Sequence, residues 1–475
     1  MVWIFLGYLV LTLVLGLWQA TRTKSQADFV LGGSKLPGWM LALSERATGE
    51  SAWLLLGFTG LVFAKGLSAI WVGVGCLTGI STAWLVLAAK FRSESERYRA
   101  MTMPEYFSAK FPDKANTIRL VSTLIIVFFF VFYVGAQFAG AGKTIQTTFG
   151  LEPIYGQIIC AVVILLYATI GGFISVVAVD VFQSVLMIIT LIVTPLVLLI
   201  QVADRGLSIP AALATSGTGM DSWTGGLAGF AGGLIIFNHF AWFFGYLGGQ
   251  PQLNARFMGM RDDRQVRIGR NIAITWTVLA YAGAVGIGLG ALTLFGRQTV
   301  PDAEMVLPYV LNTMFPWWLA GVLLAGAVAA MVSTAESMLI VAGTSISQDV
   351  YQGIVRKGQA PDRTVLMVSR AATLAVGLLG LVMALTTEKL IYTIVSYAWA
   401  GIGCSFAPAV LLSFYWDRFR GAGVVTALVT GLVTTVIWIA TGLDATVTAM
   451  GVTFAVAMGS AVLVTLARPA KSAGH

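Results

Sequence analysis

The sequence predicts an all-α polytopic membrane protein, and three observations lead to this prediction. Hydrophobic residues make up 57% of the 475 residues and charged residues only 11%. The mean hydropathy of +0.85 excludes a soluble globular protein. Apolar stretches of roughly 20 residues, the length that crosses a bilayer as a helix, recur along the whole chain.

Thirteen such stretches are predicted as membrane-spanning helices. They cover residues 2–20, 39–64, 67–90, 118–146, 154–173, 175–203, 223–248, 272–296, 310–346, 365–386, 390–416, 422–442 and 446–467. The first has no basic region before it and no convincing small-residue cleavage site after it, so we expect a retained helix and no cleavable signal peptide.

The basic residues orient these helices. With the N-terminus outside, nearly all Lys and Arg fall in inner connections or in the C-terminal tail. The exceptions are Arg46, which lies within the membrane, and the outer residues Lys65, Lys143, Arg205, Arg297 and Lys389. The sequence therefore predicts an N-terminus outside and a C-terminus inside, in a cell inner (plasma) membrane. The net charge of +8 reflects this topology and does not indicate a nucleic-acid partner.

The cysteines and the polar motifs give no sign of catalysis. Cys76, Cys160 and Cys404 each lie inside an apolar stretch, so we expect packing residues and no disulfide framework or thiolate metal site. The sequence shows no catalytic triad, phosphate-binding loop or metal cluster, and we expect no enzyme activity and no cofactor.

A polar segment interrupts the second predicted helix at residues 44–52, Ser-Glu-Arg-Ala-Thr-Gly-Glu-Ser-Ala. Glu45, Arg46 and Glu50 stand there at a depth where each charge costs about 2.5–3.5 kcal/mol on insertion scales. Such groups survive where they face a protein interior or a wet cavity. A helix that opens at mid-membrane is typical of an ion or solute site.

The seventh predicted helix is also interrupted. It carries a glycine-rich run at residues 229–233 and further glycines at Gly245, Gly248 and Gly249. Two broken helices five apart are the pattern of a five-helix inverted repeat, helices two to six against seven to eleven, with a site at the interface. Close packing of glycine-rich helices is the alternative explanation. The predicted organisation is a first helix and linker (1–38), a first repeat (39–203), a second repeat (204–416), and two C-terminal helices with a short tail (417–475).

The ninth predicted helix carries a stripe of oxygen atoms. Ala330, Ser333, Thr334 and Ser337 recur at i, i+3, i+4 and i+7, so one carbonyl and three hydroxyls lie on one face. Oxygen ligands suit a hard monovalent cation. Hydroxyls in membrane helices also bond the carbonyl one turn back, which leaves the stripe alone ambiguous. Carbonyls freed in a broken second helix would supply further ligands.

Several longer strings spread over nearly the whole chain carry a family resemblance. They are Gly-Gly-Ser-Lys-Leu-Pro-Gly-Trp (32–39), Ser-Ala-Trp-Leu-Leu-Leu-Gly (51–57), Tyr-Ala-Thr-Ile-Gly-Gly-Phe (167–173), Gln-Pro-Gln-Leu-Asn-Ala-Arg-Phe-Met (250–258), Ala-Ala-Met-Val-Ser-Thr (329–334) and Ser-Tyr-Ala-Trp-Ala-Gly (396–401). In these strings the chain resembles the sodium:solute symporter family, and within it the bacterial sodium/proline symporters. The resemblance implies a five-plus-five inverted-repeat core like that of the leucine transporter (LeuT), preceded by one helix and followed by two. It also implies a secondary active transporter in which inward sodium flow drives uptake of a small amino-acid-like solute, with proline as the expected solute.

The resemblance assigns site residues as well. Sodium would be bound by the carbonyls of Ala47, Glu50 and Ala330 and the hydroxyls of Ser333 and Thr334. The solute would be bound by Ser51, Trp53, Tyr133, Trp242 and Tyr246. These include an aromatic box that suits an apolar ring bearing an ammonium group. A candidate second ion site, present in some family members, would use Asp180, Glu336 and Ser337.

Some residues depart from the proline branch. Gly49 stands where that branch carries an aspartate, and Glu45, Arg46, Glu50 and Glu336 stand at positions that are uncharged there. Glu50 and Glu336 are therefore open to three explanations: extra cation ligands, proton carriers, or counter-charges to a cationic solute. A structural ion pair of Arg46 with Glu45 or Glu50 is a fourth.

Three alternative functions remain open at this point. The first is a sodium- or proton-coupled symporter for a different small solute. The second is a solute sensor that acts through a separate partner, since the chain ends at His475 soon after the last predicted helix and no signalling domain is expected there. The third is an ion channel, which would need a continuous pore. The expected partners are sodium, a small solute and the lipid bilayer.

Overall fold

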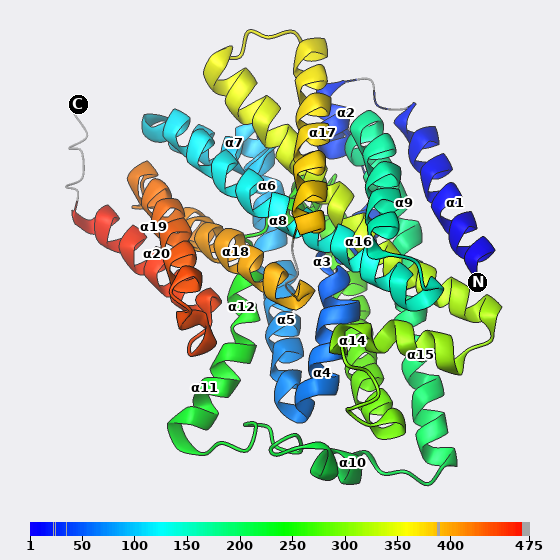
Figure 1. The fold of residues 1–475 in the computed structure, drawn as a ribbon. Coiled ribbons are helices and arrows are strands. Elements are labelled where there is room, and N and C mark those ends of the chain that lie inside the picture. Colours follow the sequence, from blue (N-terminus) through cyan, green and yellow to red (C-terminus); the bar gives the residue numbers. More distant parts are fainter. Residues whose placement is uncertain (22, 24, 35, 387–389, 468–475) are drawn as a thin grey trace.

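The structure is a computed structural model that describes residues 1–21, 23, 25–34, 36–386 and 390–467 (Figure 1). Within these ranges the regular elements are helices, apart from one isolated parallel bridge between Leu36 and Met260. Residues 468–475 of the predicted tail lie outside the described residues, as do Arg22, Lys24, Lys35 and Lys389 of the topology argument.

The helices follow the predicted division of the chain. The first segment contains α1 (Val2–Ala20) and α2 (Gln26–Leu31). The first predicted repeat contains α3 (Gly38–Gly49), α4 (Thr59–Lys65), α5 (Ile70–Thr82), α6 (Ala88–Tyr98), α7 (Met103–Lys110), α8 (Ala115–Phe149) and α9 (Pro153–Asp204). The second contains α10 (Ile209–Ser216), α11 (Gly229–Phe240), α12 (Trp242–Gly245), α13 (Pro251–Met258), α14 (Asp263–Phe295), α15 (Val306–Met314), α16 (Trp317–Thr344), α17 (Asp362–Thr386) and α18 (Ile391–Tyr415). The last segment contains α19 (Gly421–Ala440) and α20 (Ala449–Ala467).

Ten helical stretches of the described chain are long and apolar enough to cross a membrane. Two of them, Trp53–Tyr98 and Pro153–Asp204, each contain parts of two predicted spans, and the predicted seventh span falls on the shorter apolar helix Gly229–Gly245. All thirteen predicted ranges therefore fall on helices. The predicted class, an all-α multi-span membrane protein, is confirmed.

The two spans predicted within α9 meet at a glycine. Gly172 has φ 65° and ψ −158°, a backbone conformation that only glycine adopts readily, and it interrupts the helix there. A Cβ atom at this position would also collide with the ring of Phe29 in α2. The turn and the packing of α2 thus both depend on the missing side chain.

Both predicted helix breaks are present. In the second span α3 ends at Gly49, Glu50 leaves helical geometry with φ −104° and ψ 78°, and a π-helical turn at Trp53–Phe58 leads into α4. In the seventh span α12 ends before a non-helical segment that contains Gly248 with φ 74°. The chain then enters α13, whose residues are all buried.

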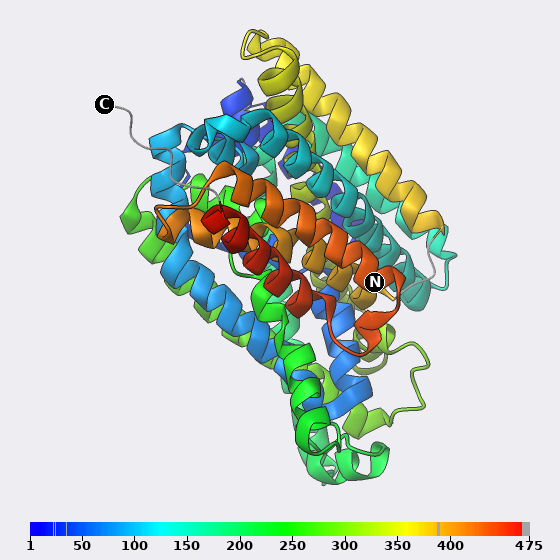
Figure 2. The ribbon, with the colours of Figure 1, turned by 90° about the vertical axis from the view of Figure 1, so that its left-hand side faces the viewer.

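The bundle has a deeply buried centre and helices at its edge. In the most apolar 18-residue window of both α16 and α18, 83% of the residues are buried, against 28% for α1. Figure 1 shows α1 on one side of the molecule and α19 and α20 on the other, and Figure 2 shows this last pair covering the face turned to the viewer. The segments predicted to precede and follow the repeats therefore flank the core.

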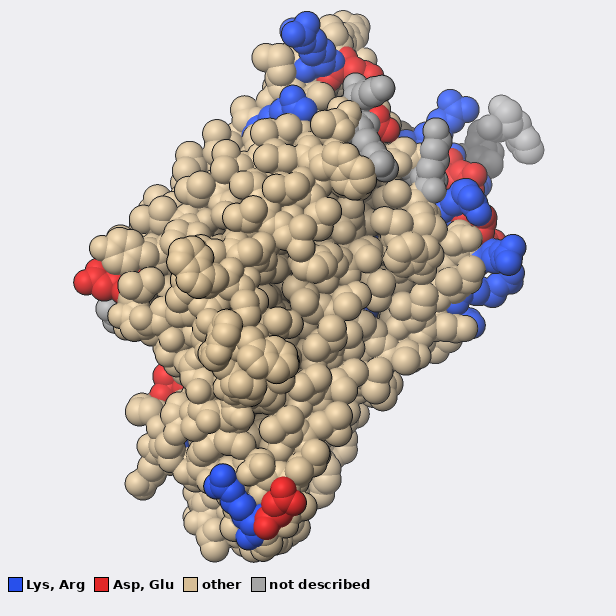
Figure 3. Space-filling model, turned by 90° about the vertical axis from the view of Figure 1, so that its right-hand side faces the viewer, with Lys and Arg blue, Asp and Glu red and all other residues tan. Residues whose placement is uncertain are grey.

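Charge is distributed unevenly over the surface. Figure 3 shows Lys and Arg gathered toward the upper part of one face and a broad middle almost without charged side chains. Such an uncharged band is expected where lipid tails cover a protein. The gathering of basic side chains at one end agrees with the predicted orientation.

Single cysteines would test that orientation, because the three native cysteines are buried. Thr218, between α10 and α11, and Gln359, before α17, are both exposed and lie on opposite sides in the predicted topology. We expect a membrane-impermeant maleimide to label Thr218→Cys in intact cells and Gln359→Cys only after permeabilisation, with the parent protein as control. The reverse pattern would show that the N-terminus lies inside.

Candidate functional site

The break in the second span frees backbone groups, and side chains bind them. The Gly49 carbonyl accepts a hydrogen bond from the Trp53 indole at 3.1 Å. The Ala52 amide donates to Gln137 Oε1 of α8 at 3.1 Å. The Trp53 amide donates to Ser51 Oγ at 3.2 Å. Because lipid offers no hydrogen bonds, these side chains are what allow the backbone to open inside the bundle.

Two hydroxyls of α16 reach carbonyls beside this break. Ser333 Oγ donates to the Ala47 carbonyl at 2.9 Å and to the Ala330 carbonyl at 3.2 Å. Thr334 Oγ1 donates to the Thr48 carbonyl at 2.9 Å. All of these residues are completely buried. The structure thus brings four of the five residues of the predicted sodium set into one cluster of oxygen atoms.

Glu50, the fifth residue of that set, directly follows α3. Its backbone has left helical geometry, so its carbonyl lies outside the hydrogen-bond pattern of that helix. The predicted set is therefore three carbonyls and two hydroxyls, all neutral oxygens. Neutral oxygens suit a hard monovalent cation, which needs its hydration shell replaced and no full counter-charge. The residues present fit sodium.

Asp180 and Ser337, from the candidate second ion site, are bridged by a guanidinium group. Arg256 Nη2 lies 3.1 Å from Asp180 Oδ2 and donates to Ser337 Oγ at 2.5 Å. Arg256 Nε donates to Ser44 Oγ at 3.1 Å. Ser44 Oγ in turn donates to Asp180 Oδ2 at 2.5 Å. Arg256 belongs to a predicted inner connection, yet it is only 1% exposed because α13 carries it into the bundle, where Asp180 compensates its charge.

Glu336, the third residue of that candidate site, stands apart from this group. It is completely buried, and within the described part of the chain neither of its carboxyl oxygens has a hydrogen-bond partner. Tyr8 of α1 and Cys160 of α9 lie within reach of its electric field. The structure therefore gathers Asp180 and Ser337 and leaves Glu336 outside their hydrogen-bonded group.

Aromatic rings from three spans meet next to the break. Trp53 stacks on Trp242 of α12 with ring centroids 4.3 Å apart and an interplanar angle of 17°. Tyr246 lies against Trp399 of α18 at 4.2 Å. The rings of Trp242 and Trp399 are 5.7 Å apart. These four residues form what we call the aromatic cluster.

Hydrogen bonds connect the aromatic cluster to two further spans. The hydroxyls of Ser51 and Tyr133 are 3.1 Å apart, and the Trp399 indole donates to Tyr133 at 3.0 Å. The Trp242 indole donates to the Tyr392 hydroxyl at 3.1 Å. All five predicted solute residues are thus linked to one another. The sequence did not identify Trp399 or Tyr392 as site residues, although Trp399 lies in one of the family-like strings, because a string match does not show which aromatic side chain turns inward.

Glu45, Arg46 and Glu50 form one buried network. Arg46 Nε lies 2.5 Å from Glu45 Oε2, and Nη2 bonds the other oxygen of the same carboxylate. Arg46 Nη1 lies 3.0 Å from Glu50 Oε1. The Trp84 indole donates to Glu45 Oε2 at 3.0 Å. The structural ion pair considered for Arg46 is present, and it involves both glutamates.

Glu50 joins this network to the aromatic cluster. The Tyr246 hydroxyl donates to Glu50 Oε1 at 3.3 Å, and the Tyr281 hydroxyl of α14 donates to Oε2 at 2.9 Å. The main chain of Glu50 therefore faces the predicted sodium set while its side chain binds a predicted solute residue. Nothing in the sequence singled out Tyr281, which lies in an ordinary apolar stretch.

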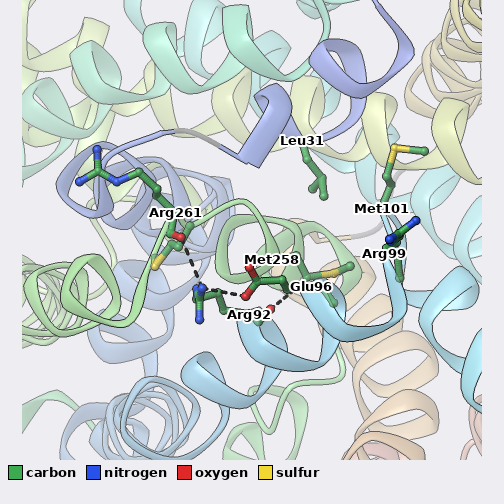
Figure 4. Close-up of a pocket in the computed structure, with 10 residues that line it drawn as sticks. Leu31, Arg92, Glu96, Arg99, Met101, Met258 and Arg261 are labelled. Carbon is green, nitrogen blue, oxygen red and sulfur yellow. Dashed lines mark hydrogen bonds and ion pairs between the residues drawn. The ribbon is translucent and has the colours of Figure 1, made fainter.

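A separate pocket of about 230 Å³ opens near the end of α13 (Figure 4). Leu31 and Arg261 contribute to its walls, and Figure 4 shows Arg92 directed toward Glu96 and the Arg261 backbone. Arg92 is paired with Glu96 at 2.8 Å and with Asp263 at 2.9 Å. None of the predicted sodium or solute residues lines this pocket, and its central arginine is already neutralised.

Comparisons with known proteins agree with this geometry. The model of the sodium:solute symporter family matches residues 29–431. The sodium/proline symporter of Escherichia coli is 32% identical over 441 residues, which are 91% of this chain and 86% of that protein. The high-affinity proline transporter PutP of Bacillus subtilis is 32% identical over 91% of this chain and 90% of its own length. The osmoregulated proline transporter OpuE of the same organism is 31% identical over 92% and 88%.

Solved structures share the fold. A Na+-coupled sialic acid symporter in a substrate-bound outward-open state matches with a TM-score of 0.79 at 16% identity, covering 98% of each chain. The nucleobase-cation-symport transporter Mhp1 matches with a TM-score of 0.52 at 15% identity, over 90% of this chain and 91% of its own. MhsT matches at 0.53 and 13% identity, over 90% and 97%. The expected LeuT-like fold is confirmed, and the chain belongs to the sodium:solute symporter family of multi-pass membrane transporters.

Proposed function

We propose that this sodium-coupled symporter takes up proline, by alternating access across the plasma membrane. The observation that carries the proposal is the double role of the break after α3. Ala47 and Glu50 contribute carbonyls on the side of Ser333 and Thr334, whereas Ser51 and the following Trp53 face the aromatic cluster. One short segment thus joins the proposed ion site to the proposed solute site.

The proposed sodium site is the oxygen cluster between α3 and α16. Ser333 and Thr334 now donate to backbone carbonyls. A bound sodium ion would instead be coordinated by the hydroxyl oxygens together with the carbonyls of Ala47, Glu50 and Ala330. Because each ligand comes from one of two helices, the ion stabilises the conformation in which α3 and α16 are close.

The proposed solute site is the aromatic cluster with Ser51 and Tyr133. A pyrrolidine ring is apolar and packs against indole faces, and a secondary ammonium group is attracted to π faces. Hydroxyls of Ser51 and Tyr133, 3.1 Å apart, offer donors for a carboxylate. The nearest named functions among the relatives, sodium/proline symport and proline transport, support proline as the solute.

Coupling follows if each ligand binds one conformation better than the other. Sodium that orders the segment from Ala47 to Glu50 also fixes Ser51 and Trp53, which complete the solute site. Release of sodium on the side where it is scarce removes that order, so the solute leaves as well. The reciprocal effect, in which solute tightens sodium binding, is required by linkage.

A second candidate is a different small solute that carries a positive charge. The observation that favours it is the contact between Glu50 and Tyr246, which brings a buried carboxylate to the edge of the aromatic cluster. The proline branch has no carboxylate at this position. A thermal-shift screen with sodium and a panel of amino acids, betaines and organic cations would rank these solutes by the stabilisation that each gives.

Transport is tested with purified protein in proteoliposomes and labelled proline. We expect uptake that requires an inward sodium gradient and stops when potassium replaces sodium, because the solute site is complete only with sodium bound. Empty liposomes provide the control. Equal uptake with and without the gradient would contradict sodium coupling, and stabilisation by another solute alone would replace proline.

Removal of one proposed ligand should weaken sodium binding. For Thr334→Ala we expect the sodium concentration for half-maximal uptake to rise about tenfold or more, because a hydrogen-bonding group at a charge contributes about 1.5–3 kcal/mol. Thr334→Ser should retain most of the affinity. The matched control is Thr435→Ala, which removes a buried hydroxyl that bonds Thr453 in the α19–α20 pair. Equal effects of Thr334→Ala and Thr435→Ala would argue for a structural role only.

Loss of one hydroxyl should weaken solute binding separately from sodium binding. Tyr133→Phe removes the group that accepts the Trp399 indole proton, and we expect the KM for proline to rise about fivefold to tenfold. The sodium dependence should change less than twofold. Tyr167→Phe is the control, since within the described residues the buried Tyr167 hydroxyl has no hydrogen-bond partner. A larger effect of Tyr133→Phe on sodium than on proline would contradict the assignment.

A further inference from the structure

We propose that Arg256 is a built-in cation that occupies the place of a second sodium ion, so that the transporter binds one sodium ion per chain. The inference rests on the proposed function, since it concerns the number of coupling ions. It is drawn from three contacts of one guanidinium group. It also assigns a role to α13, the short buried helix that follows the break in the seventh span.

The contacts of Arg256 are those that a small cation would need. Its Nη2 lies between the Asp180 carboxylate at 3.1 Å and the Ser337 hydroxyl at 2.5 Å. Its Nε binds Ser44, which itself donates to Asp180 at 2.5 Å. Its Nη1 donates to the Gln252 carbonyl one turn back at 2.8 Å, which anchors the side chain to its own helix.

Arg256 is also held from the remaining direction. Its guanidinium lies over the ring of Phe173 at 5.1 Å from the centroid, and the side chain is 1% exposed. Asp180 is completely buried. The group is therefore a desolvated one-to-one pair with no net charge, and it needs no further cation for neutrality.

A sodium ion at the same carboxylate would face strong repulsion. Two unit charges about 4 Å apart in a protein interior oppose each other enough to weaken binding by roughly three orders of magnitude. The other oxygen cluster has no such obstacle, because Ala47, Ala330, Ser333 and Thr334 contribute only neutral groups. The sodium ion should therefore bind at the neutral cluster alone.

The experiment counts bound sodium on the purified full-length protein by equilibrium binding of radioactive sodium, without any solute. We expect one saturable sodium ion in the wild type and in Arg256→Lys, which keeps the charge. We expect a second ion in Arg256→Gln, because Asp180 is then free to act as a ligand. The double variant Arg256→Gln/Asp180→Asn should return to one.

Two saturable ions in the wild type would overturn the inference. So would a single ion in Arg256→Gln when its thermal stability and first-ion affinity match the wild type. If Arg256→Gln does not fold, Asp180→Asn decides: one bound ion supports the inference, and the loss of an ion from a two-ion wild type contradicts it.

Thr334→Ala separates this inference from the proposed function. Loss of the single ion in Thr334→Ala identifies it as the ion of the proposed sodium site. A single ion that persists in Thr334→Ala would overturn the proposed sodium site and leave the count at one.

Discussion

A polar backbone group without a hydrogen bond inside a membrane protein costs several kcal/mol, and this chain leaves its helical path twice within its own bundle. The first break is stable only because distant side chains bind the freed groups. Gln137 of α8 binds one amide, and Ser333 and Thr334 of α16 bind carbonyls. The break is thus a property of the packed bundle. An isolated segment with the same sequence would close into a helix or remain unfolded.

The buried charges obey the same constraint. Arg46 binds Glu45 and Glu50, and Arg256 binds Asp180, so each guanidinium in the centre has a carboxylate partner. Breaking such a pair by loss of one member destabilises a protein by about 3–5 kcal/mol. A transport cycle that moves these helices must therefore carry the pairs along or exchange their partners. The Arg256 pair joins the two predicted repeats, which makes it the more sensitive of the two to repeat motion.

Much of the fold was predictable from the sequence, since lipid imposes length and apolarity on every span and topology on the basic residues. The broken second and seventh spans were also predictable, because charges and glycines are unusual at mid-membrane. The site was predictable where one helix supplies a pattern, as with Ser333 and Thr334. It was not predictable where the relevant fact is a contact between distant segments. Arg256 belongs to a predicted inner connection, and only the packing of α13 brings it to Asp180.

The stack of Trp53 on Trp242 has a consequence for affinity. Each ring covers with its neighbour the surface that the proposed solute would contact. Aromatic pairs contribute about 0.5–1.5 kcal/mol beyond the burial of their area. The pair acts as an intramolecular competitor, and the observed dissociation constant reports the difference between two stacking partners. A transporter that must release its cargo in every cycle benefits from such a competitor, because the rings close on each other as the solute departs and the empty site does not have to admit water.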